Sequence, residues 1–259
     1  MASPARAWRE REDRLLRIRL SRPKANVLDA AMVAALDEAF TGALRPSPGA
    51  PALRGVLLDA EGPHFSFGAS VEEHLPERCA AMLKGFHALV LKMVELPVPI
   101  LVAVKGQCLG GGLEVAVAGH LVFAAPDAKL GQPEIALGVF APAASCLFPE
   151  RMGQGAADDL LLSGRSVDGA EALRLGLVNA VAQDPEAAAL AWFDAHLAGR
   201  SGSSLGFAAR AARHGFAERV RAKLAAVEEL YLAGLMSTRD PVEGLRAFLE
   251  KRPPRWEDR

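Results

Sequence analysis

The segment from residue 100 to residue 140 constrains the fold most strongly, because it holds three elements of different character close together. Residues 100–104 (ILVAV) are apolar on both faces, which is typical of a strand in the centre of a sheet. Three consecutive glycines, Gly110 to Gly112, precede a predicted helix. The apolar pattern of residues 121–124 predicts another strand. This order predicts an α/β core in which the chain turns sharply at the glycines.

The same alternation of short strands and helices extends through the first 200 residues. Residues 16–21 alternate apolar and polar side chains, which predicts a half-buried strand with Arg17 and Arg19 on its solvated face. Asp29 precedes apolar residues at helical spacing and is expected to be the N-cap of that helix. Further expectations are a buried strand over 55–59, helices over 77–95 and 166–175, the latter with Asp168 near its start, and a Pro- and Gly-rich loop over 45–51.

The last part of the chain has a different character, because no strand pattern is recognisable in it. Apolar residues recur every three or four positions over residues 216–235 and predict a long amphipathic helix, and a second helix is expected over 242–250. We therefore divide the chain into an α/β core, residues 1–200, and a helical region, residues 201–259. The apolar stripe of the long helix has to be covered, which predicts self-association.

Composition excludes several classes of protein. Lys and Arg number 30 against 31 Asp and Glu, and this net charge of −1 argues against a general nucleic-acid binder. The 51% hydrophobic and 24% charged fractions are those of a globular protein. The three cysteines lack CxxC spacing, which indicates a reducing compartment without disulfides. The charged N-terminus is unlike a secretory signal, and no apolar stretch approaches the ~20 residues of a membrane span, so we expect a cytoplasmic protein.

Most common catalytic motifs are absent. The sequence contains no GxxxxGK[ST] phosphate loop, no GxGxxG after a strand and no GxSxG nucleophile turn. Its six histidines form no HExxH motif or other close ligand pair, so no metal site is expected.

Chemistry is indicated instead by the glycine run and two glutamates. The first N–H groups of a helix lack partners and can hold a negatively charged oxygen. Glu114 lies in the first turn after the glycines and Glu134 follows the next strand, so the two carboxylates can together handle one water and one proton. A tight turn and a glutamate that complements the helix dipole explain the same residues without catalysis.

Six ordered segments, which together span nearly the whole chain, resemble the crotonase (enoyl-CoA hydratase/isomerase) superfamily. They are LSRPKANVLDAAM (20–32), HFSFGASVEEH (64–74), KGQCLGGGLEVAVAGH (105–120), KLGQPEIALG (129–138), LLLSGRSVDGAEALRLGLVNAV (160–181) and EGLRAFLEKRPPRW (243–256). The resemblance implies an α/β fold of repeated ββα turns coiled into a spiral. It also implies that the helical C-terminal region covers the active site and supports homotrimers or homohexamers.

The resemblance further implies an acyl-CoA thioester as substrate and no separate cofactor, since coenzyme A is part of the substrate. The N–H groups of Ala69 and Gly111 would form an oxyanion hole. Glu114 would activate water for attack at Cβ, and Glu134 would deliver a proton to Cα. The further substrate- and coenzyme A-binding residues that the resemblance implies are Lys24, Ala25, Phe67, Gly68, Ser70, Val71, Gly110, Gly112, Phe140 and Lys251.

Three departures from the family pattern bear on the acyl group. Ser70 stands where the family has Asp, and Phe67 stands where small residues are usual. The loop after Gly138 contains Phe140 and lacks the usual glycines. Phe67 and Phe140 would form flat apolar walls suited to a ring. The combination resembles hydratases of cyclic dienoyl-CoA thioesters such as cyclohexa-1,5-diene-1-carbonyl-CoA, although drift in the packing around the site explains the same changes.

The resemblance leaves other activities open. An isomerase or decarboxylase of the same superfamily is one alternative, although such enzymes often lack one of the two glutamates. A non-catalytic oligomeric binding protein, including an RNA-binding one, is another. The two intact glutamates and the near-neutral charge count against it.

Overall fold

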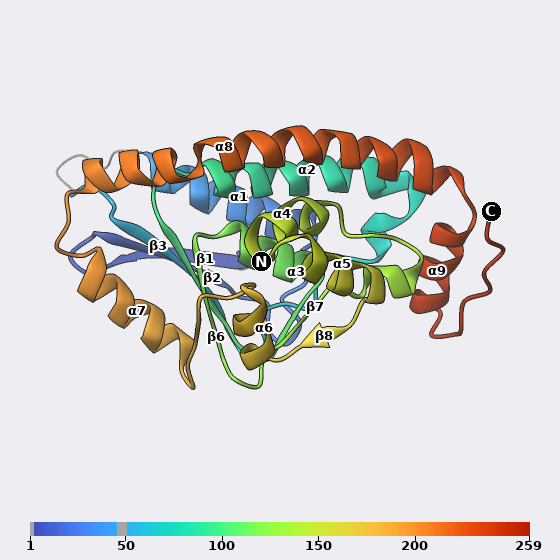
Figure 1. The fold of residues 1–259 in the computed structure, drawn as a ribbon, viewed down its shortest axis with the longest axis horizontal. Coiled ribbons are helices and arrows are strands. Elements are labelled where there is room, and N and C mark those ends of the chain that lie inside the picture. The colour runs from blue at the N-terminus through green and yellow to red at the C-terminus, as the bar shows by residue number, and fades with distance from the viewer. Residues whose placement is uncertain (1–2, 46–50) are drawn as a thin grey trace.

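A six-stranded sheet with the order β1-β2-β3-β4-β6-β9 runs through the molecule (Figure 1). The computed structural model describes residues 3–45 and 51–259, so the loop expected over 45–51 lies almost entirely outside the described residues. β1 pairs antiparallel with β2, and the other neighbours pair in parallel. The strands of this sheet are β1 (Ala5–Glu10), β2 (Leu15–Leu20), β3 (Gly55–Ala60), β4 (Ile100–Val104), β6 (Leu121–Ala124) and β9 (Ala180–Val181).

A second sheet consists of three short strands, β5 (Gln107–Leu109), β7 (Lys129–Gly131) and β8 (Ser166–Val167). β4, β5 and α3 (Gly111–Ala118) form one ββα turn. The next turn consists of β6, β7, the 3₁₀ helix η2 (Pro133–Leu137) and α4 (Pro142–Met152). Isolated bridges join the extended segment after β3 to its neighbours, before α2 (Pro76–Glu95) begins. The repeated ββα turns that the resemblance implied are thus confirmed.

Helices cover both faces of the main sheet (Figure 1). The larger core lies between one face and helices that include α1, α2, α3, α4 and α8, while α7 covers the other face. This double cover explains why β3 and β4 are buried along their whole length. The remaining helices are α1 (Ala30–Leu44), α5 (Gln154–Ser163), α6 (Gly169–Leu175), α7 (Pro185–His196), α8 (Gly202–Glu229) and α9 (Asp240–Leu249).

The predicted strand over 16–21 is present as β2, but its expected half-burial is wrong. Arg17 is only 6% exposed, and its guanidinium donates to the buried Asp59 carboxylate of β3, with 2.7 Å between Nε and Oδ2. Arg19 donates to the other oxygen of Asp59 at 2.6 Å, and both arginines pair with Glu186 at the start of α7. The polar face of β2 is therefore an ion-pair network beneath α7.

The predicted N-cap of the first helix is correct, whereas the predicted start of a later helix is not. Asp29 is the N-cap of α1, as predicted, and accepts a hydrogen bond from the Met32 N–H at 2.9 Å. The helix expected over 166–175 begins later, because residues 166 and 167 form β8 and Asp168 is the N-cap of α6.

The long helix α8 begins at Gly202, well before the predicted residue 216, and lies alongside α2 (Figure 1). Val220 and Leu224 on its apolar stripe belong to the main core and are covered by the chain itself. The stripe therefore does not require a second subunit. The expectation that an uncovered apolar stripe drives self-association is wrong, because the chain covers the stripe itself. The predicted boundary near residue 200 falls between α7 and α8. Within the described residues, no helix has both the length and the apolarity needed to cross a membrane.

Candidate active site

Two backbone N–H groups meet where α3 begins. Gly111 is the first residue of α3, and a Cβ atom placed on it would lie only 3.2 Å from the nitrogen of Ala69. Among the described residues, neither the Ala69 N–H nor the Gly111 N–H donates to a protein group. Adjacent, fixed donors of this kind at a helix N-terminus suit an oxygen that gains negative charge. The structure therefore brings the two predicted oxyanion donors together.

Side chains that the sequence analysis did not select hold the Ala69 segment in place. The buried Ser66 hydroxyl donates to the Asn26 carbonyl at 2.8 Å and accepts from the Gly68 N–H at 3.0 Å. The buried Asn26 amide donates in turn to the carbonyls of Glu61 and His64. Ser66 also exchanges backbone hydrogen bonds with β5, the strand that precedes α3. The segment that holds Ala69 is thus hydrogen-bonded through Ser66 to the strand that leads into Gly111.

Glu114 lies in the first turn of α3 and is buried. Its Oε1 accepts a hydrogen bond of 2.7 Å from the N–H of Ala144, in the first turn of α4. Burial raises the pKa of Glu114, while hydrogen bonds from the N–H groups of Ala144 and Ala143 oppose this rise. The N-terminus of α4 thus favours the ionised form of Glu114.

Glu134 reaches the same place from the 3₁₀ helix η2, which follows β7. A Cβ atom on Gly110 would lie 2.5 Å from Glu134 Oε1, so only glycine leaves room for this carboxylate. Gln132 is buried, and in the amide orientation that satisfies both its ends its nitrogen donates to Glu134 Oε2 at 2.9 Å. Burial raises the pKa of Glu134, and the charge of Glu114 raises it further. Glu114 accepts from two N–H groups of α4, whereas Glu134 accepts from one backbone N–H, its own, and is opposed by the charge of Glu114, so a proton shared by the pair favours Glu134.

The predicted acyl-binding residues fall into two different surroundings. Phe140 packs edge-on against Tyr231, with 5.1 Å between ring centroids, in an apolar cluster that also holds Val71 and Val139. Phe67 is 46% exposed and packs edge-on against His64, with 5.0 Å between ring centroids.

Ser70, the remaining departure from the family pattern, is buried. Its hydroxyl donates to Glu72 Oε2 at 3.0 Å, so a carboxylate already holds this side chain. Gly68, Gly110 and Gly112 lie around the oxyanion donors, and a Cβ atom on Gly112 would collide with Ser66.

The predicted coenzyme A contacts lie at the surface. Lys24 is exposed and precedes Ala25, whose carbonyl accepts from the Phe67 N–H at 2.9 Å. Lys251 is also exposed and follows α9, a helix that packs on η2. The structure thus attaches both lysines to segments that contact the site, and their roles in coenzyme A binding remain predictions.

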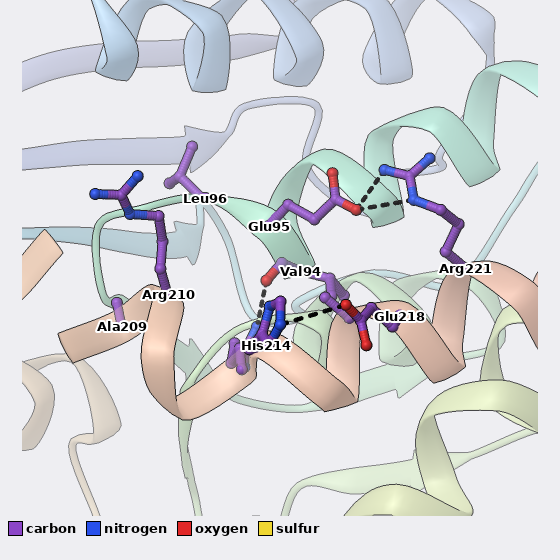
Figure 2. A pocket seen from close by; sticks show the side chains of 10 residues that line it. Val94, Glu95, Leu96, Ala209, Arg210, His214, Glu218 and Arg221 are labelled. Carbon is purple, nitrogen blue, oxygen red and sulfur yellow. Dashed lines mark hydrogen bonds and ion pairs between the residues drawn. The ribbon is translucent and has the colours of Figure 1, made fainter. Parts of the chain in front are cut away.

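The opposite end of α3 is held by two arginines. Arg213 donates to the Ala118 carbonyl at 2.8 Å, and Arg151 donates to the Val117 carbonyl at 3.2 Å. Positive charge at a helix C-terminus complements the dipole and fixes the position of α3. A groove of about 270 Å³ lies beside Arg213, between the end of α2 and α8, and Figure 2 shows Arg221 of α8 reaching Glu95 across it. None of the predicted site residues lines this groove.

This arrangement defines a class of enzyme in which paired N–H donors bind a carbonyl oxygen beside two carboxylates of unequal acidity. The chain belongs to the enoyl-CoA hydratase/isomerase family, whose model matches residues 10–259. It is 64% identical over 258 residues to cyclohexa-1,5-dienecarbonyl-CoA hydratase from Thauera aromatica, across 100% of this chain and 98% of that protein.

More distant relatives extend the comparison. A probable enoyl-CoA hydratase from Bacillus subtilis is 32% identical, across 90% of this chain and 92% of that protein. A crystal structure of an enoyl-CoA hydratase/isomerase from Pseudoalteromonas atlantica superimposes with a TM-score of 0.82 at 29% identity, covering 98% of this chain and 99% of that one.

Proposed function

We propose that this chain is a hydro-lyase that adds water to, or removes it from, a conjugated cyclic dienoyl-CoA thioester, cyclohexa-1,5-diene-1-carbonyl-CoA. The observation that carries this proposal is the full-length identity of 64% to a hydratase named for that substrate. The pairing of Glu114 with Glu134 supports hydration, because the reaction needs one group to take a proton and another to give one.

The chemistry follows from the geometry. The thioester oxygen accepts hydrogen bonds from the N–H groups of Ala69 and Gly111. Ionised Glu114 takes a proton from water as the water oxygen bonds to Cβ, and protonated Glu134 gives its proton to Cα. Negative charge builds on the thioester oxygen between these steps, and losing one donor to such an oxygen typically costs ~3 kcal/mol.

The remaining features of the proposal follow the family. The two carboxylates and two N–H donors supply the proton transfers and charge stabilisation that hydration requires, so no cofactor beyond the substrate's own coenzyme A is proposed. We also propose a homotrimer or homohexamer, a cytoplasmic location, and no nucleic-acid or membrane partner.

Turnover of a panel of thioesters tests the substrate. We expect kcat/KM for cyclohexa-1,5-diene-1-carbonyl-CoA to exceed that for crotonyl-CoA by at least ~10-fold, since a hydrophobic pocket discriminates shapes by about this factor. Phe140→Ala should shrink the preference more than it lowers activity on crotonyl-CoA, because it removes an aromatic wall. Preference for linear enoyl-CoAs would refute the cyclic substrate.

The mass of the product separates hydration from the other family reactions. Hydration adds one water to the thioester, isomerisation leaves its mass unchanged, and decarboxylation removes carbon dioxide. A product of unchanged mass would therefore replace the hydratase by an isomerase. Binding without turnover of any thioester would favour the non-catalytic alternative.

A further inference from the structure

Tyr231 is the single tyrosine of the chain, and its side chain is completely buried at 0% exposure. It lies in a π-helical turn, Leu230–Gly234, that follows α8. Such turns interrupt regular helices and are frequent at functional sites. This turn places the tyrosine ring against Phe140, in the apolar cluster that also holds Val71. Tyr231 therefore lies beside two residues that the sequence analysis assigned to the substrate.

The hydroxyl group of Tyr231 has no partner within the described part of the chain. Burying an unpaired hydroxyl costs about 1–3 kcal/mol, and phenylalanine would fill the same space without this cost. Packing therefore explains the ring but not the oxygen. A polar group that is buried and unpaired in the protein alone fits one that receives its partner from a ligand.

The other polar groups at this end of the site are already engaged. Pro142 has no N–H, and the next N–H groups of α4, those of Ala143 and Ala144, hold Glu114. The amide nitrogen of Gln132 holds Glu134. The N–H groups of Ala69 and Gly111 are assigned to the thioester oxygen. Of the donors discussed, the Tyr231 hydroxyl is the one left for a second oxygen of the substrate.

The charges of the two carboxyl groups also act on Tyr231. Burial raises the pKa of the Tyr231 phenol, and Cys79, Glu134 and Glu114 raise it further by their charge. The raised pKa keeps the phenol protonated near neutral pH, so it can donate a hydrogen bond. In the proposed reaction Glu114 takes a proton from the attacking water and Glu134 protonates Cα, so the oxygen that lies beside them is the one that water contributes.

We propose that Tyr231 is a substrate-binding residue whose hydroxyl donates a hydrogen bond to the oxygen that hydration adds to the acyl ring. This proposal rests on the proposed function. The oxygen belongs to the attacking water before the reaction and to the ring hydroxyl afterwards, so the same hydrogen bond orients the nucleophile and holds the product.

Binding of two stable ligands tests the hydrogen bond without turnover. 2-Hydroxybenzoyl-CoA carries an oxygen on Cβ and has no hydrogen on Cα, so it cannot lose water, and benzoyl-CoA lacks this oxygen. By calorimetry we expect the wild-type enzyme to bind the hydroxylated ligand ~10-fold more tightly, and Tyr231→Phe to abolish this preference without weakening the second ligand. In turnover, Tyr231→Phe should lower kcat ~10–100-fold and leave KM within ~3-fold, because the coenzyme A contacts are unchanged.

Controls separate this role from packing. Cys79→Ala trims another buried member of the same cluster and should change the affinity for both ligands by the same factor. Tyr231→Phe should unfold at the same temperature as the wild type or a higher one, because it removes an unpaired buried hydroxyl.

The two proposals fail in different ways. If the wild-type enzyme prefers the hydroxylated ligand only while Tyr231 is intact, but hydrates no cyclic dienoyl-CoA, the substrate assignment alone fails. A hydroxyl preference that survives Tyr231→Phe, or is absent from the wild type, overturns the role of Tyr231.

Discussion

Glu114 and Glu134 carry the same functional group in surroundings that favour different protonation states. The N-terminus of α4 donates hydrogen bonds to Glu114, whereas Glu134 has the neighbouring charge of Glu114 beside it. Pairs of carboxyl groups that are separated in this way can act as base and acid in one reaction. On these electrostatic grounds we propose Glu114 as the base and Glu134 as the acid, which are the roles that the resemblance implies.

Replacing either carboxyl group by an amide tests these roles. We expect Glu114→Gln and Glu134→Gln each to lower kcat for hydration by ~10²-fold or more, because acid–base groups contribute about 10²–10⁴-fold. Binding of the thioester, measured by calorimetry, should change little, since both side chains keep their size. Full activity in either variant would remove that glutamate from the mechanism.

The pH dependence of kcat follows from the two raised pKa values. Glu114 has to be ionised, so activity is lost as the pH falls through its raised pKa. Glu134 has to be protonated, so activity is lost as the pH rises through its raised pKa. We expect a bell-shaped profile whose acid limb lies well above ~4.3, the usual pKa of glutamate. A kcat that stays constant down to pH ~5 would contradict the raised pKa of Glu114.

Stability provides a control on the same groups. A carboxyl group whose pKa is raised by folding contributes stability at low pH, and this contribution is lost as the pH rises through the folded-state pKa. Glu134→Gln should therefore be more stable than the wild type in alkaline solution, by thermal unfolding, and the difference should shrink in acid. Low activity of this variant then cannot be attributed to unfolding.

At the scale of elements, the ion-pair network between β2, β3 and α7 makes a separate prediction. Asp59→Asn keeps the shape of the side chain but leaves the Arg17 charge buried beside a neutral partner. Breaking a buried pair costs about 3–5 kcal/mol when the remaining charge has no other partner. Because Arg17 keeps its pair with Glu186, we expect a loss near the lower end, about 3 kcal/mol, which urea unfolding would measure. The control is Glu61→Gln, whose exposed pair with Arg6 is worth at most ~1 kcal/mol. Equal effects of the two substitutions would show that burial of the network adds nothing.

The same network shows which features of the fold could not be predicted from the sequence, namely those that depend on contacts between distant segments. Periodicity revealed β2, β3 and α2 because their apolar patterns are local. The burial of Arg17 depends on α7, which joins the sheet more than 160 residues later in the chain. The start of α7 does carry a local signal, because Asp184 is its N-cap and Pro185 follows, but the predicted elements did not include this helix. β5, β7 and β8 have two or three residues each and are too short for any periodic pattern.

The site residues show the same difference between local sequence patterns, which can be predicted, and long-range contacts, which cannot. Glu114, Glu134 and the two predicted oxyanion donors lie in contiguous motifs, and the structure brings all four together. Asn26, Ser66 and Gln132 act by tertiary hydrogen bonds that no spacing reveals, although each lies inside or next to a quoted motif. Tyr231 lies in a helical pattern that predicts only burial, and its unpaired hydroxyl is visible only in three dimensions.

At the scale of the whole molecule, the predicted self-association is still open to measurement. Large apolar side chains remain exposed on helices away from the α8 stripe, including Leu162 at 74% and Phe248 at 54% exposure. Single exposed side chains of this kind also occur in monomers, so the expected trimer or hexamer rests on the family resemblance. We expect sedimentation to give three or six times the chain mass of 27.4 kDa. A stable monomer at micromolar concentration would contradict the trimer and hexamer.

The division of the proposed oxyanion hole between two turns of the spiral has a consequence for refolding. Ala69 precedes α2 and Gly111 follows β5, so each turn supplies only one of the two N–H donors. Neither turn can bind the thioester oxygen with both donors until the two turns are packed together. Strands and helices can form locally while the two turns are still unstacked, and such a chain would show nearly native circular dichroism without activating any thioester. Recovery of enzymatic activity after dilution from denaturant is therefore a stricter measure of completed assembly than recovery of helical signal.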